Sequence, residues 1–64
     1  MSNYTIEQLP SRDGVTVILK SDAGRGGGEA LDVGHGKSAA DASRALAAKL
    51  RAAADVADRF AAEQ

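Results

Sequence analysis

His35 is the residue of this chain that first suggests chemistry, because a carboxylate (Asp32) and a hydroxyl (Ser38) lie within three residues of it. A catalytic histidine needs a nucleophile and an orienting carboxylate that the fold brings into reach. Nothing else in the sequence supports such a triad, and a core this small leaves little room for a substrate pocket. We therefore predict a partly exposed loop histidine, no catalytic residue and no enzyme activity.

A second candidate is the run Gly36-Lys37-Ser38, which matches the end of a phosphate-binding loop. That motif needs a glycine five residues before its last glycine, and position 31 is leucine. We predict instead a strand-to-helix joint in which Ser38 caps the helix. No cofactor is predicted.

The third candidate is Arg25, which lies in the glycine-rich run 24–28. Arg-Gly-Gly segments of RNA-binding proteins occur in repeats, usually with aromatic residues between them. A single copy predicts a mobile loop between strands, whose arginine can contact a partner. With one histidine and no cysteine, the chain predicts neither a metal site nor a disulfide.

The length and composition favour one small domain that needs extra support. Sixty-four residues make a single domain that is marginally stable alone, and without disulfides the remaining support is oligomerisation. The net charge of −1 argues against broad nucleic-acid binding. No membrane span and no signal peptide are expected, which predicts a cytoplasmic protein. The alanine and glycine content suggests a bacterial or phage genome.

Three segments read as strands. Residues 4–9 and 15–20 are rich in β-branched residues, and residues 29–33 form a third, shorter run. In the second strand Val15, Val17 and Leu19 share one face, while Ile18 lies on the other. In the third we expect Leu31 and Val33 to point inward, with a short connection over 34–37.

Residues 38–63 contain no glycine or proline and read as one long helix. Ser38 and Asp41 form an approximate capping box. The opposite face is charged, and its arginines and aspartates at spacing four can pair. An apolar stripe recurs at helical spacing along the other side, formed by Ala42, Leu46, Leu50, Ala53, Ala57 and Phe60.

These elements predict an α+β fold over residues 1–64, in which a three-stranded antiparallel meander (4–33) packs against one long C-terminal helix (38–63). A helix of this length outreaches strands of six residues by several turns. The apolar residues beyond the sheet then need a partner surface, and a second copy of the helix is the simplest one. We predict a homodimer interface of Ala53, Val56, Ala57 and Phe60.

The run from Gly36 to Ala42, followed by Leu46 and Leu50, resembles the HicB-like antitoxin domain. Members of that family follow a strand with G-x-[ST]-x-x-[DE]-A and an amphipathic helix. The resemblance covers residues 4–50 and implies an antitoxin-type role, although the glycine-rich run 24–28 departs from the family pattern. The order of elements is also similar to the second half of a double-stranded-RNA-binding domain.

Two functions follow as hypotheses. The first is a small bacterial or phage protein-binding module of the inhibitor, antitoxin or anti-defence (anti-CRISPR-like) type. It would bind itself and an unidentified protein, with no membrane contact, and its partner-binding residues would be Ile18, Lys20, Arg25 and Lys37. The alternative is a nucleic-acid-binding domain whose basic patch forms in a dimer from Arg12, Lys20, Arg25 and Lys37.

Overall fold

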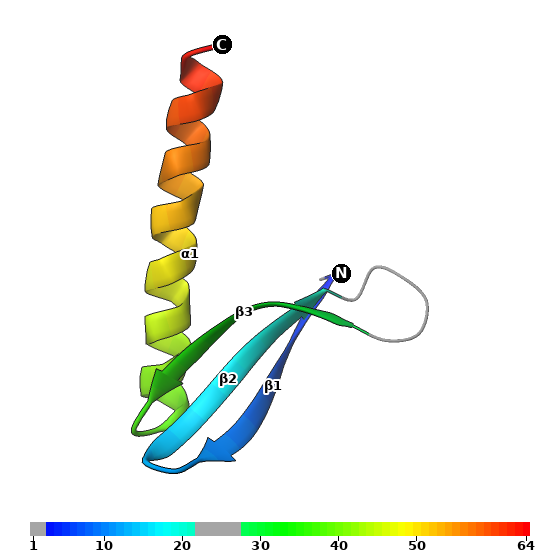
Figure 1. Ribbon diagram of the computed structural model, residues 1–64, viewed down its shortest axis with the longest axis vertical. Coiled ribbons are helices and arrows are strands. Elements are labelled where there is room, and N and C mark those ends of the chain that lie inside the picture. The colour runs from blue at the N-terminus through cyan, green and yellow to red at the C-terminus, as the bar shows by residue number, and fades with distance from the viewer. Residues whose placement is uncertain (1–2, 22–27) are drawn as a thin grey trace.

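The computed structural model describes residues 3–21 and 28–64, and it shows three antiparallel strands followed by one long helix (Figure 1). The strands are β1 (Tyr4–Ser11), β2 (Gly14–Ser21) and β3 (Glu29–Gly36), and the helix is α1 (Ala39–Ala62). The strands lie in the order β1-β2-β3. The predicted α+β meander with a C-terminal helix is confirmed. Arg25 and most of the predicted glycine-rich loop lie outside the described residues.

The first two strands form a hairpin with a two-residue loop. Ser11 pairs with Gly14, which leaves Arg12 and Asp13 as the turn. The turn thus lies between the two predicted strands, but β1 runs two residues further than expected and includes Pro10. Proline has no amide hydrogen to donate, and its place on an edge strand is where a sheet tolerates it.

The third strand differs from the prediction at its end. It continues through Gly34, His35 and Gly36, which we expected in a connection. The two glycines face the helix at close range: a Cβ on Gly34 would lie 2.3 Å from the Ala42 carbonyl oxygen, and one on Gly36 would lie 2.6 Å from the Ala42 amide nitrogen. These glycines thus serve the close approach of α1 to the strand rather than a turn.

The same contact overturns the predicted orientation of Leu31 and Val33. Val17, which is buried, pairs with Gly34, whereas Ile18 pairs with Val33. Directly paired residues share a face, so Val33 lies on the side away from the helix. Val33 and Leu31 are both exposed, and the register shifts where Leu31 lies. The prediction failed because glycine, not valine, occupies the helix-facing positions of β3.

The core is small and lies where the first turns of α1 cross β2 and β3. Its buried members are Val17, Ala42 and Leu46, and Val15 and Leu19 pack against them. The predicted shared face of the three β2 residues is confirmed. Fully burying one such aliphatic side chain contributes about 1.5–3 kcal/mol, so few residues carry the stability of the monomer.

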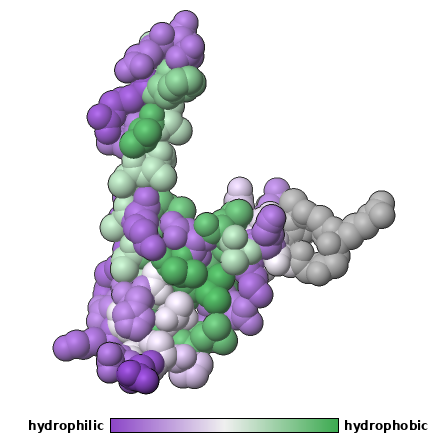
Figure 2. Space-filling model, viewed as in Figure 1, coloured by the Kyte–Doolittle hydropathy of each residue, from purple (hydrophilic) through white to green (hydrophobic). Residues whose placement is uncertain are grey.

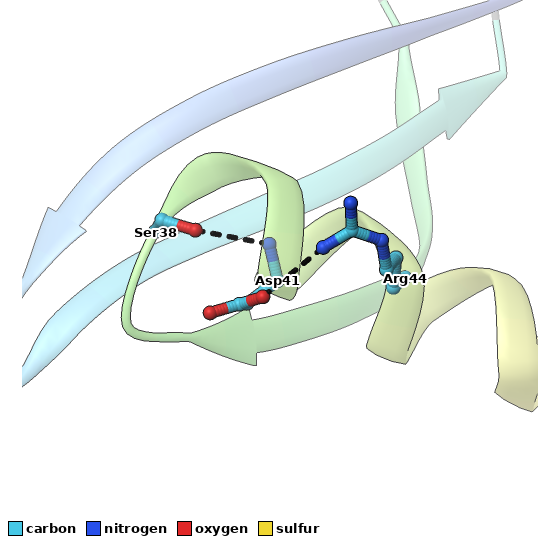
Figure 3. Close-up of polar contacts among 3 residues, drawn as sticks. All are labelled: Ser38, Asp41 and Arg44. Atoms are coloured by element: carbon cyan, nitrogen blue, oxygen red, sulfur yellow. Dashed lines mark hydrogen bonds and ion pairs between the residues drawn. The ribbon is translucent and has the colours of Figure 1, made fainter.

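The start of α1 carries the predicted Ser38 cap, while the Asp41 carboxylate of the predicted capping box pairs with Arg44 (Figure 3). Ser38 has an extended backbone, and its hydroxyl oxygen accepts a hydrogen bond from the Asp41 amide at 3.1 Å. The Asp41 carboxylate accepts a bond from Arg44 at 3.2 Å. An acidic residue in the first turn also interacts favourably with the helix dipole. Ser38 and Asp41 therefore set where the helix begins.

The upper half of α1 extends well beyond the sheet (Figure 1). Its 24 residues span about 36 Å, whereas the eight residues of β2 span about 26 Å. Every residue from Ala48 onward is exposed. We call residues 51–62 of α1 the overhang. The molecule is elongated as a result, with a radius of gyration of 13.6 Å where about 11 Å is expected for this length.

Candidate protein-binding surfaces

His35 does not assemble with Asp32 and Ser38. Its Nδ1 lies 3.1 Å from the Thr16 hydroxyl and 3.3 Å from that of Ser11, on the sheet face away from the helix. Asp32 lies on the helix side, opposite Leu19, and the Ser38 hydroxyl is occupied by the helix cap. The three residues therefore form no triad in this fold.

Neither a cluster of metal-ligating side chains nor a membrane-spanning helix occurs among the residues that the structure describes. No group of three or more histidine, cysteine, aspartate or glutamate side chains lies close enough there to hold a metal ion. None of the described helices combines the length and the hydropathy needed to cross a lipid bilayer.

Many of the large apolar side chains of this small domain are exposed to solvent. In Figure 2 they gather over the sheet beside the helix and again along the upper half of α1. From the strand register and the helical spacing, most of them lie on one of two sides of the molecule: the sheet face away from α1, or the side on which the sheet faces α1. Among residues 3–21 and 28–64, the large hydrophobic residues that are exposed are Tyr4, Ile6, Leu9, Leu31, Val33, Leu50, Val56 and Phe60.

The first surface is the outer face, meaning the side of the sheet away from α1. Leu9 on β1, Ile18 on β2 and Val33 on β3 form a diagonal strip across the three strands. Ile18 pairs with Val33 on one side and with Glu7 on the other, and Leu9, which pairs with Thr16, is the diagonal neighbour of Ile18. Leu9 and Val33 are each 42% exposed, and Ile18 is half-buried between them. We call these three residues the outer strip.

Polar groups flank the outer strip and lie at both of its ends, since Glu7 pairs with Ile18 and Thr16 pairs with Leu9. Lys20 lies 2.6 Å from the Glu7 carboxylate, toward the end of the sheet where β2 finishes. His35 lies with Thr16 and Ser11 toward the opposite end. An apolar centre with a polar border is the anatomy of a protein–protein interface.

The structure places three of the four predicted partner-binding residues, and these fall in two regions. Ile18 and Lys20 share the outer face, because they lie two residues apart on β2. Lys37 follows the last residue of β3 at the other end of the sheet, next to the β1–β2 hairpin: a Cβ on Gly14 would lie 3.0 Å from the Lys37 Cα. Arg25 lies outside the described residues. Ile18 and Lys20 thus belong to one surface and Lys37 to another region.

Sequence reasoning missed Leu9 and Val33 as members of this surface. The alternation in β2 placed Ile18 correctly, but the face of β3 was inverted. The signal that could have corrected it is the Gly-x-Gly pair at 34 and 36. Two glycines two residues apart in a strand mark a face that a helix backbone approaches, and this pattern moves Val33 to the other face.

The second surface is the apolar side of the overhang, where the four predicted interface residues lie. Ala53, Val56, Ala57 and Phe60 are all exposed on a continuous helix, and Phe60 is 65% exposed. Val56 and Phe60 line a shallow depression together with Arg59 and Glu63. Large apolar residues that are exposed together on a helix, with no other element packed against them, are typical of an interaction surface.

The charged side of α1 carries weak pairs. Arg59 lies 3.9 Å from Asp55, one of the predicted pairs at spacing four. Nearer the sheet, Lys49 lies 3.2 Å from Asp32 and joins the helix to β3. The pKa of Asp32 is lowered, first by the hydrogen bond from the Val33 amide and then by that from Lys49. Exposed pairs of this kind contribute about 1 kcal/mol or less, so the helix is held mainly by its core contacts.

Comparisons of the chain with protein-family models, with curated proteins and with solved structures found no match. The resemblance to the HicB-like antitoxin domain stays a prediction that rests on the residues alone.

Proposed function

We propose that this chain is a small, non-enzymatic protein-binding module of the inhibitor, antitoxin or anti-defence type, which works in the bacterial cytoplasm as a homodimer. The outer strip is the observation that carries the proposal. Ile18 and Val33 are paired and Leu9 is their diagonal neighbour on the same face, with no element of the described chain over them. The overhang supports the homodimer.

The form of the outer face favours a protein as its target. The sheet offers a rigid apolar centre, and rigid surfaces lose little conformational entropy on binding. The border offers both hydrogen-bonding groups (Thr16 and His35) and a charged pair (Glu7 and Lys20). Such a surface suits a target with an apolar patch of its own and polar groups around it.

The test of this function is capture of a target protein by the outer face. The tagged protein is used to isolate partners from a bacterial lysate, and the affinity of each is then measured for the wild type and for Leu9→Lys/Val33→Lys. We expect the double variant to lose at least tenfold in affinity, because the lysines would bring charge into the apolar centre. Ala48→Lys, an exposed helix position, is the matched control. Equal binding by both variants would contradict the proposal.

The alternative, a nucleic-acid-binding domain, draws support from Arg12 and Lys37. Arg12 lies in the β1–β2 turn and Lys37 beside it, so one end of the sheet carries two cations. Lys20 is paired with Glu7 and lies away from that end. Titration with duplex DNA and RNA over a range of salt concentrations tests it, since phosphate contacts strengthen as salt falls. Affinity that Arg12→Gln and Lys37→Gln both reduce would favour this alternative over protein binding.

A further inference from the structure

The surface area of the chain points to a missing partner. The chain exposes 4998 Å², whereas a compact monomer of 6.5 kDa is expected to expose about 3,800 Å². The surplus is about 1,200 Å² per chain. The area is that of all 64 residues, and the overhang, every residue of which is exposed, contributes part of the surplus. A second copy of this chain would therefore supply the area that the fold lacks.

The apolar side of the overhang continues the face that the sheet buries. Phe60 follows Ala42 by 18 residues, which is five turns of 3.6 residues. Phe60 therefore lies on the same side of α1 as Ala42, which is fully buried against the sheet. The helix does not cover the part of the sheet formed by β1. Ile6 lies on the helix-facing side because it pairs with Leu19, and it is 53% exposed. The exposed apolar side of the overhang and the exposed helix-facing side of β1 therefore face the same space, where α1 diverges from the sheet.

The spacing of the apolar residues in this region is symmetric about Asp55. Leu50 and Phe60 each lie five residues from it, and Ala53 and Ala57 each lie two residues from it. In a two-fold pair of antiparallel helices, residues at equal distances on opposite sides of the centre meet. Such a pair would place Phe60 against Leu50 of the other copy and Ala53 against its Ala57. Alanines at the centre let the helices approach to about 8 Å.

Charge does not oppose this pairing. At 100° per residue, the four apolar positions fall within one arc of α1, and Asp55 falls on the opposite side. The other charged residues of the overhang, Arg51, Asp58 and Arg59, also fall outside the apolar arc. No buried charge and no opposed like charges are therefore required at the centre of the interface.

We infer that two copies of this chain pair as a two-fold dimer of antiparallel overhangs, centred at Asp55, with Phe60 of each copy against Leu50 of the other. The last turns of each helix then lie in the space between α1 and the sheet of the other copy, next to its exposed Ile6. This arrangement rests on the homodimer of the proposed function and specifies its register. The outer face of each sheet stays free in it.

Disulfide cross-linking tests the register on a clean background, because the chain has no cysteine. Leu50→Cys and Phe60→Cys are prepared separately, then unfolded, mixed and refolded together under mild oxidation. In the antiparallel dimer the two cysteines face each other, and a disulfide-linked species of twice 6.5 kDa forms in the mixture. In either variant alone, like positions lie about 15 Å apart along the helix, beyond the reach of a disulfide.

Two controls accompany the experiment. Asp55→Cys, on the opposite side of the helix, measures cross-linking by random collision. Ala53→Cys mixed with Ala57→Cys repeats the test without removing an apolar side chain, which covers the case in which replacing Leu50 or Phe60 prevents dimerisation. Light scattering on the reduced samples records which variants remain dimers.

A disulfide in the Leu50→Cys and Phe60→Cys mixture, with none in those two variants alone, is the expected result. Like positions in Ala53→Cys or Ala57→Cys alone lie about 6 Å apart along the helix, so the alanine-derived mixture should cross-link faster than either of its components alone. Cross-linking within Leu50→Cys or Phe60→Cys alone would overturn the antiparallel register, yet it would leave the homodimer of the proposed function standing. A monomer mass for the wild type at every concentration would overturn both the register and the homodimer. Target capture by the outer face is measured separately and is independent of these outcomes.

Discussion

Gly34 on β3 lies directly against Leu46 on α1: a Cβ placed on Gly34 would come within 2.7 Å of the Leu46 Cβ. Real Cβ atoms do not approach so closely, so the absence of a side chain at Gly34 sets how near the helix lies to the sheet. This contact orients α1 over β3 and β2 and leaves β1 bare.

Replacement of Gly34 by alanine should destabilise the protein. The added methyl group would overlap the Ala42 carbonyl oxygen, and overpacking of a core costs about 1–3 kcal/mol. The double variant Gly34→Ala/Leu46→Ala should not recover stability, because the nearest atom belongs to the backbone of Ala42. Urea unfolding measures these changes. Val33→Ala, on the outer face, is the control and should unfold near the wild type; a Gly34→Ala protein of wild-type stability would contradict the close helix contact.

Removal of the helix cap should have a smaller effect. Ser38→Ala deletes the acceptor of the Asp41 amide bond, and loss of such a cap costs about 1 kcal/mol. Ser38→Asp keeps an acceptor at the same position and should retain most of the stability. The free energy of unfolding of the two variants is compared at one protein concentration. Equal losses in both would show that the hydroxyl does not cap α1.

The hydrogen bonds that the Asp32 carboxylate accepts, first from the Val33 amide and then from Lys49, should make stability depend on pH in one direction. The pKa of Asp32 is lower in the folded chain than its ordinary value, so the stabilisation is complete at pH values above that ordinary value. It is lost as pH falls through the folded pKa. Asp32→Asn should therefore be less stable than the wild type at pH 7, and the difference should close in acid. Asp58→Asn, at an exposed position, should show no such closing difference.

The melting temperature should report the homodimer. If the folded state is a dimer, the midpoint of thermal unfolding rises with protein concentration. Phe60→Ser removes the largest exposed apolar side chain of the overhang, and its melting temperature should be lower and nearly independent of concentration. Arg51→Ser, on the other side of the helix, should behave as the wild type. A wild-type midpoint that does not move over a hundredfold dilution would contradict the dimer.

The order of elements and most of their bounds could be predicted from the sequence because each carries a local signal. The β-branched run in β2 indicates a strand, and the serine before a segment free of glycine and proline indicates a capped helix. The hairpin turn follows from Asp13 and Gly14. These signals need no knowledge of distant contacts.

The face and length of β3 could not be predicted in the same way. Glycines usually mark turns, so Gly34 and Gly36 read as a connection. Their actual role depends on where the helix crosses the strand, which is a tertiary contact. The same contact decides that Val33 joins the outer strip. The candidate surface was therefore found only in part, through Ile18 and Lys20.

The order of elements along the chain also bears on how the protein acquires its structure. Each element packs on the one that precedes it: β2 on β1, β3 on β2 and α1 on β3. Chains dominated by such local contacts fold quickly, because little loop-closure entropy must be overcome. In the proposed dimer, the encounter of two chains would then limit the rate of assembly. Refolding followed by fluorescence or circular dichroism should accordingly show a fast phase that is independent of concentration and a later phase that accelerates as the protein is concentrated.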